Sequence, residues 1–137
     1  MSGEPAGAEP IGRVLVMDDD PIILRSTSRM LRLLGYDVDT APDGETAVAR
    51  YREALAAGRR FDVAILDLSV GVTHAGGVEA LEHLAAADPL VCAVVSSGDL
   101  DDTRLAQYLA RGFKGRLKKH YDRASLKDLL AALVPHR

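Results

Sequence analysis

Four carboxylates stand directly after apolar runs, where they could hold a cation. Asp18, Asp19 and Asp20 are consecutive and follow the apolar stretch 13–17. Asp67 follows a second apolar stretch. Like charges repel one another, and burial raises the pKa of a carboxyl group unless a positive charge offsets the effect. The triplet therefore requires either a cation or separate roles for its three members.

Hydroxyl and ammonium groups follow two further apolar runs. Ser96 and Ser97 come after residues 90–95, and Lys119 comes after residues 115–118. Taken singly, each of these polar residues is more simply a turn or helix-capping residue. Taken together with the carboxylates, they suggest a site for a cation and a phosphoryl group. Clustered carboxylates are suitable ligands for Mg²⁺, whose remaining ligands are often water and phosphate oxygens. A hydroxyl and an ammonium opposite them suit a phosphoryl group.

The elements that must position these groups alternate along the chain. Short apolar runs predict strands at 13–17, 61–66, 90–95 and 115–118, and the alternating segment 36–40 predicts an edge strand. Helical periodicity predicts helices at 21–34, 44–57, 77–87, 102–111 and 123–134. In the first of these helices, one face collects Ile22, Ile23, Ser26, Met30, Leu33 and Leu34.

This alternation predicts an α/β fold. Strands and helices in strict alternation form a parallel sheet with right-handed crossovers and helices on both faces. Such sheets bind ligands at the carboxyl ends of their strands. We therefore expect the carboxylates, hydroxyls and ammonium to meet at one edge of the sheet.

Composition is that of an ordinary globular protein. The chain has 137 residues, 47% hydrophobic and 27% charged, enough for one domain with a single core. Its net charge of −3 argues mildly against nonspecific binding to DNA or anionic membranes. No stretch is long and apolar enough to span a bilayer, and the N-terminus lacks the pattern of a secretory signal. We expect a cytoplasmic protein with a flexible tail at 1–11 and one domain at 12–137.

Several motifs in order resemble a known family. The segments VLVMDDDP, VAILDLS, VVSSGD and GFKGRLKKHY are similar to those of the receiver domain of two-component response regulators, over residues 12–135. GRVLVMDDD, the DLS…GG segment, VSSGD and GFKG most resemble receivers attached to hybrid sensor histidine kinases. The resemblance implies a flavodoxin-like (βα)5 fold, with a five-stranded parallel sheet in the order 2-1-3-4-5.

The resemblance also implies a role for each site residue. Asp67 would be the phosphoacceptor, and Ser96 and Lys119 would bind the phosphoryl oxygens. The Mg²⁺ ion, or Mn²⁺ in its place, would be held by Asp67, Asp19 directly, Asp18 through water, and the backbone carbonyl of Ser69. Asp20 precedes Pro21 and is interpreted from the residues themselves as the N-cap of the first helix.

Three departures from the family pattern leave questions open. His120 follows Lys119 where the family usually has proline after a cis bond, so the Lys119–His120 bond is either trans or a strained cis peptide. Arg116 stands where many receivers carry an aromatic switch residue, so a rotating aromatic is not expected. The loop 68–77 is longer than usual, and its His74 is interpreted as a solvent-facing residue.

The implied function is that of a phosphoacceptor switch. Its partners would be a sensor histidine kinase or a histidine phosphotransfer protein, and a downstream protein. A homodimer through residues 102–134 is a further alternative. Because only VPHR follows the last helix, we expect no DNA-binding module, and we expect no membrane partner. The chain is not expected to turn over an external substrate as an enzyme.

Two alternatives stay open from the sequence. One is a receiver-like interaction module that is no longer phosphorylated. The other is a Mg²⁺-dependent phosphohydrolase with an aspartyl-phosphate intermediate. Such hydrolases commonly place a second Asp two residues after the nucleophile, and Ser69 occupies that position here, which disfavours the hydrolase.

Overall fold

Five parallel strands form one sheet in the order β2-β1-β3-β4-β5, as the sequence predicted. The computed structural model describes residues 9–69, 76–98 and 100–134. The strands are β1 Arg13–Met17, β2 Asp37–Ala41, β3 Val63–Asp67, β4 Ala93–Ser97 and β5 Gly115–Lys118. The helices are α1 Pro21–Leu33, α2 Gly44–Ala56, α3 Gly76–Ala87, α4 Asp102–Ala110 and α5 Arg123–Leu133.

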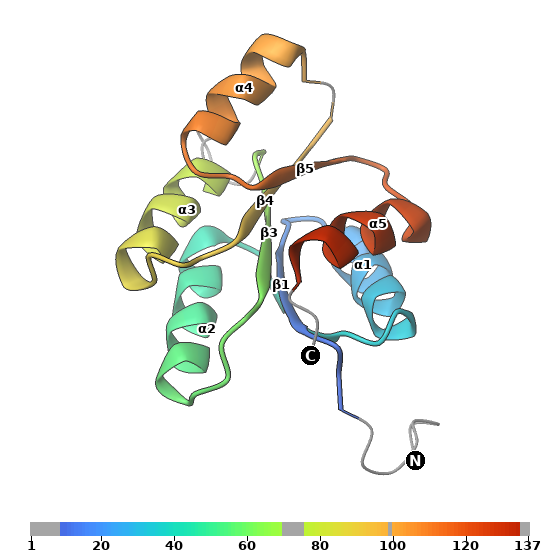
Figure 1. Cartoon of the computed structure of the whole chain (residues 1–137), viewed down its shortest axis with the longest axis vertical. Coiled ribbons are helices and arrows are strands. Elements are labelled where there is room, and N and C mark those ends of the chain that lie inside the picture. The colour runs from blue at the N-terminus through green and yellow to red at the C-terminus, as the bar shows by residue number, and fades with distance from the viewer. Residues whose placement is uncertain (1–8, 70–75, 99, 135–137) are drawn as a thin grey trace.

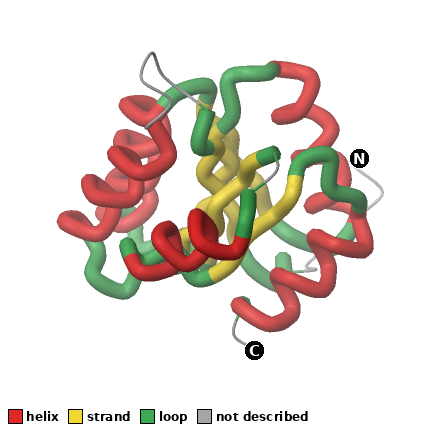
Figure 2. Tube along the Cα trace, turned by 90° about the horizontal axis from the view of Figure 1, so that it is seen from above, coloured by secondary structure: helices red, strands yellow, loops and turns green. Residues whose placement is uncertain are grey.

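The helices cover both faces of the sheet. Helices α1 and α5 lie on one side, and α2, α3 and α4 lie on the other (Figure 1). Seen from above, the strands form a central layer between these helices (Figure 2). Each face buries its own apolar cluster: one contains Leu15, Tyr51, Leu66 and Leu84, and the other contains Val14, Ile65, Leu126 and Leu130. The sheet is therefore a rigid support for its strand ends.

Two strands run further toward their carboxyl ends than the sequence suggested. Asp67 is the last residue of β3, and Ser96 lies within β4 rather than after it. The two residues are partners in the sheet, and the Leu68 amide still donates to the Ser96 carbonyl at 3.1 Å. The apolar pattern missed these positions because a polar side chain at a ligand-binding strand end does not interrupt the backbone ladder.

The apolar face expected of the first helix is only partly buried. In α1 the buried residues are Thr27, Ser28 and Leu31. Ile22 is 70% exposed and Leu33 is 63% exposed. The buried face is therefore rotated away from the predicted apolar stripe, toward Thr27, Ser28 and Leu31. Two large apolar side chains are thereby left on the surface.

The starts of α1 and α3 show how the elements next to the site are held. Asp20 is the N-cap of α1, and its Oδ1 accepts from the Ile22 amide at 2.9 Å, with Pro21 as the first helical residue. This confirms the interpretation of Asp20. Gly77, at the start of α3, lies so near β3 that an added Cβ would approach the Asp67 carbonyl oxygen to 2.9 Å. Close packing of α3 thus helps to fix the end of β3.

Some expectations fall outside the described residues. His74 lies there, as do residues 1–8 of the expected N-terminal tail. Within the described tail, the Ile11 amide donates to the Gly35 carbonyl at 3.0 Å. Within the described ranges, no helix is both long and apolar enough to cross a membrane.

Candidate functional site

Three carboxylates meet at the carboxyl edge of the sheet. Asp18 and Asp19 follow β1, and Asp67 ends the neighbouring β3. Each offers an oxygen that lies within 4.8 Å of oxygens on the other two. Asp67 is fully buried and Asp18 nearly so, whereas Asp19 is exposed. Hard carboxylate oxygens at this spacing are the donor set that Mg²⁺ or Mn²⁺ takes in proteins.

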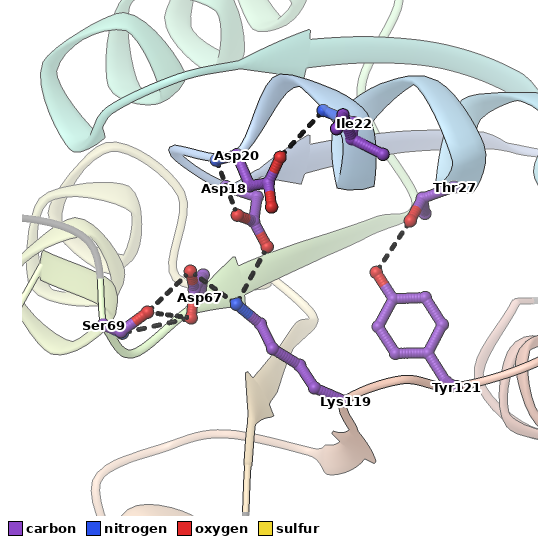
Figure 3. Close-up of polar contacts among 8 residues, drawn as sticks. All are labelled: Asp18, Asp20, Ile22, Thr27, Asp67, Ser69, Lys119 and Tyr121. Carbon is purple, nitrogen blue, oxygen red and sulfur yellow. Dashed lines mark hydrogen bonds and ion pairs between the residues drawn. The ribbon is translucent and has the colours of Figure 1, made fainter.

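Lys119 provides the opposite charge. Its Nζ lies 2.9 Å from Asp67 Oδ2 and 3.1 Å from Asp18 Oδ2, so one ammonium joins two buried carboxylates (Figure 3). Burial alone would lower the pKa of Lys119, but the bonds to Asp67 and Asp18 raise it above its ordinary value. Lys119 therefore supplies a positive charge to the site at neutral pH. No peptide bond in the described chain is cis, so the Lys119–His120 bond is trans, one of the two forms left open by the sequence.

The second set of contacts to Asp67 comes from Ser69. The Ser69 amide donates to Asp67 Oδ1 at 3.0 Å, and the Ser69 hydroxyl lies 3.0 Å from Oδ1 and 2.9 Å from Oδ2. Ser69 thus orients the carboxylate through its amide and side chain. The sequence did not predict these contacts of the Ser69 amide and hydroxyl, and the role of its backbone carbonyl as a metal ligand stays a prediction.

Ser96 supplies a buried hydroxyl without a hydrogen-bond partner among the described residues. It is 1% exposed and stands directly beside Asp67 in the register of β3 and β4. A buried hydroxyl that makes no hydrogen bond is costly, because its solvation is lost without replacement. A group with acceptor oxygens placed on Asp67 would satisfy it. The site is therefore complementary to an anion bound next to Asp67.

Charge balance favours a bound cation as well. Burial raises the pKa of the Asp18 carboxyl, and the Asp20 amide, which donates to Asp18 Oδ1 at 2.9 Å, opposes that effect. The nearby charge of Asp67 raises the Asp18 pKa further, and Lys119 lowers it. Lys119 carries one positive charge against three carboxylates. The residues present therefore fit a divalent cation, which would add the missing positive charge.

Comparison with known proteins agrees with this geometry. The family model of the response regulator receiver domain matches residues 14–131. The chain belongs to this receiver family. The transcriptional regulatory protein PrrA of Mycobacterium leprae is 36% identical over 127 residues, which are 91% of this chain and 51% of PrrA. The transcription factor SKN7 of Chaetomium thermophilum is 27% identical, over 90% of this chain and 16% of its own length.

Solved receivers share the fold. The chemotaxis protein CheY4 of Vibrio cholerae superposes with a TM-score of 0.78 at 26% identity, covering 92% of this chain and 99% of CheY4. This receiver spans about half the length of PrrA. PrrA and SKN7 are both named as transcription regulators, so neither adds support for the resemblance to hybrid-kinase receivers, which stays a prediction.

Sequence reasoning missed one contact of this receiver. The hydroxyl groups of Thr27, in α1, and Tyr121, after Lys119, are 2.8 Å apart (Figure 3). Neither residue carried a signal in the sequence, because Thr27 occupies a helix position and Tyr121 resembles an ordinary core aromatic. Arg116, at the expected switch position, is half-buried, and its Nε has no hydrogen-bond partner in the described structure.

Proposed function

We propose that this receiver accepts a phosphoryl group on Asp67 in a Mg²⁺-dependent reaction. The donor is a phosphohistidine on a sensor histidine kinase or a histidine phosphotransfer protein. One observation carries the proposal: the buried Asp67 carboxylate lies beside two carboxylates that could help it hold a cation, the Lys119 ammonium and the Ser96 hydroxyl, which has no partner among the described residues. A structural role for Asp67 would not require a free hydroxyl beside it.

The chemistry is a transfer between two nucleophiles. An Asp67 carboxylate oxygen attacks phosphorus, an O–P bond forms, and the P–N bond to the donor imidazole breaks, with its electron pair remaining on the imidazole. Ser69 orients the Asp67 carboxylate through its amide and hydroxyl. Lys119 neutralises charge on a phosphoryl oxygen, and Ser96 donates to another. A bound Mg²⁺ supplies further charge neutralisation.

Replacing Lys119 with alanine is expected to slow phosphorylation by about 100-fold, the loss typical of one transition-state donor. The ammonium is the only described cation in contact with Asp67. The measurement is the rate of phosphoryl incorporation from acetyl phosphate. Lys127→Ala, which changes an exposed lysine on α5, is the control and should keep the wild-type rate. A Lys119→Ala variant with unaltered transfer would remove Lys119 from the reaction.

The exposed face of α1 is the surface on which we place the donor protein. It contains Arg25 and Arg29 between the exposed Ile22 and Leu33, along a groove of about 580 Å³. A second groove, which Ile22 also lines, extends to Lys119. Helix α1 carries no acidic residue, and its arginines form no ion pair with any described residue. A donor helix with acidic residues around an apolar stripe would complement this face.

Reversing one charge tests this surface. Arg29→Glu should lower phosphotransfer from a protein donor about tenfold or more, because like charges then face each other, and should leave acetyl phosphate reactivity unchanged. The donor used is whichever member of a panel of purified histidine kinases phosphorylates the wild type fastest. Arg104→Glu, on the exposed surface of α4, is the matched control. Equal protein-donor rates for the two variants would place docking elsewhere.

Output is proposed to pass through a different face, which includes α4. None of the residues of α4 is buried, although Tyr108 packs against the edge of the core. We propose that phosphorylation alters the α4–β5–α5 face and thereby its contact with a downstream protein or a second copy of the chain. We place the reaction in the cytoplasm, where histidine kinases obtain ATP.

A further inference from the structure

The position of Lys119 depends on a short segment that leaves the sheet. The Lys119 amide donates to the Ser97 carbonyl at 2.7 Å, which is the last sheet contact of this strand. The next residue, His120, is exposed and follows a trans peptide bond. Asp122 then caps α5 by accepting from the Ser125 amide at 2.8 Å. Between the Lys119–Ser97 bond and the Asp122 cap, a further contact is needed to hold the backbone that carries the Lys119 ammonium.

Tyr121 makes that contact. Its ring packs at the edge of the apolar cluster between α1, α5 and the sheet, and its hydroxyl lies 2.8 Å from Thr27 Oγ1. Thr27 is 1% exposed and belongs to α1, the helix that begins directly after the Asp18–Asp20 triplet. One hydrogen bond thus connects the segment carrying the ammonium with the helix that follows the metal-binding carboxylates (Figure 3).

We propose that Tyr121 is a positioning residue for phosphotransfer, which holds Lys119 against Asp67 and Asp18 through its hydrogen bond to Thr27. The inference rests on the proposed function, since it concerns the same site. Among the described residues, the hydrogen bond of the Tyr121 hydroxyl is to Thr27 and not to Asp67, so we assign Tyr121 a role through Lys119. The bond restricts a segment whose backbone at residue 120 is not fixed by a proline ring.

Tyr121→Phe is the direct test because it removes one hydroxyl and keeps the ring. We expect the rate of phosphorylation by acetyl phosphate to fall about fivefold, the size of one net hydrogen bond. Thr27→Val, which replaces the other hydroxyl by a methyl group, should give the same loss, and the double variant should lose no more than either single variant. Tyr108→Phe, on α4, is the matched control and should keep the wild-type rate.

Two further readouts separate positioning from simple stability. In a Lys119→Ala background, Tyr121→Phe should cause no additional loss of rate, because the group it positions is gone. The side-chain ammonium signal of Lys119 in nuclear magnetic resonance spectra should shift in Tyr121→Phe and remain in place in Tyr108→Phe. A fivefold loss that persists without Lys119, or an unchanged ammonium signal, contradicts the inference.

The outcomes also separate this inference from the proposed function. If the wild type takes no phosphoryl group, the proposed function fails, and the ammonium signal still tests the positioning role. If the wild type is phosphorylated and Tyr121→Phe is phosphorylated equally fast, the positioning role fails alone.

Discussion

Asp67→Asn is expected to abolish phosphoryl incorporation while leaving the receiver folded. The amide has nearly the volume of the carboxylate, so the fully buried position at the end of β3 stays filled. It lacks the anionic oxygen that attacks phosphorus, and it removes one of the three carboxylates that share the site. Relief of the repulsion among the carboxylates opposes the loss of the Asp67–Lys119 ion pair, so we expect little change in thermal stability in the metal-free protein.

Intact mass after incubation with acetyl phosphate and Mg²⁺ measures this effect. The wild type should gain the mass of one phosphoryl group, and Asp67→Asn should gain none. Asp128→Asn, on the exposed surface of α5, makes the same chemical change away from the site and should behave as the wild type. A variant at residue 67 that still gains the group would show that another residue is the acceptor.

Asp19→Ala is expected to lose phosphorylation and Asp20→Ala is expected to lose stability, although the two residues are adjacent. Asp19 is exposed and forms no side-chain hydrogen bond or ion pair with a described residue, and its carboxylate faces Asp18 and Asp67. Its removal should therefore abolish Mg²⁺-dependent phosphorylation at almost no cost in stability. Asp20 accepts from the Ile22 amide as the N-cap of α1, so its removal should cost about 1 kcal/mol of unfolding free energy.

Two measurements on each variant separate these effects. Mn²⁺ affinity by electron paramagnetic resonance reports the cation site, and urea unfolding reports stability. Asp19→Ala should lose the affinity and keep the unfolding midpoint, whereas Asp20→Ala should keep the affinity and unfold at lower urea. Loss of Mn²⁺ binding in Asp20→Ala but not in Asp19→Ala would reverse the assignment of the triplet.

Much of the fold could be predicted from the apolar runs and the alternation of strands and helices in the sequence. Buried parallel strands read as apolar runs, and their alternation with helices predicts a parallel sheet with right-handed crossovers, whereas the order of the strands was implied by the family resemblance. The same rule brings Asp18, Asp67 and Lys119 to one edge of the sheet, and in the structure their side chains are in contact or close to it. These residues were predictable because strand ends locate them without knowledge of side-chain packing.

The rest depends on contacts that a linear pattern does not encode. In α1 an apolar stripe containing Ile22 and Leu33 suggested a buried face, yet the helix buries Thr27 and Ser28 instead. Hydrophobicity could not show this rotation, because the buried Thr27 and Ser28 are polar residues that an apolar pattern leaves out. The Thr27–Tyr121 bond joins residues far apart in sequence. Neither residue is charged, and although Tyr121 ends the GFKGRLKKHY segment, nothing in the sequence pairs it with Thr27.

The central claim is that Asp67 accepts a phosphoryl group with the help of a divalent cation. Intact mass spectrometry of the wild-type chain, incubated with acetyl phosphate and Mg²⁺ or with acetyl phosphate and a chelator, tests it most directly. We predict one added phosphoryl group with Mg²⁺, located on Asp67 by peptide mapping, and none with the chelator. An unchanged mass in both samples, or equal addition in both, would contradict the claim.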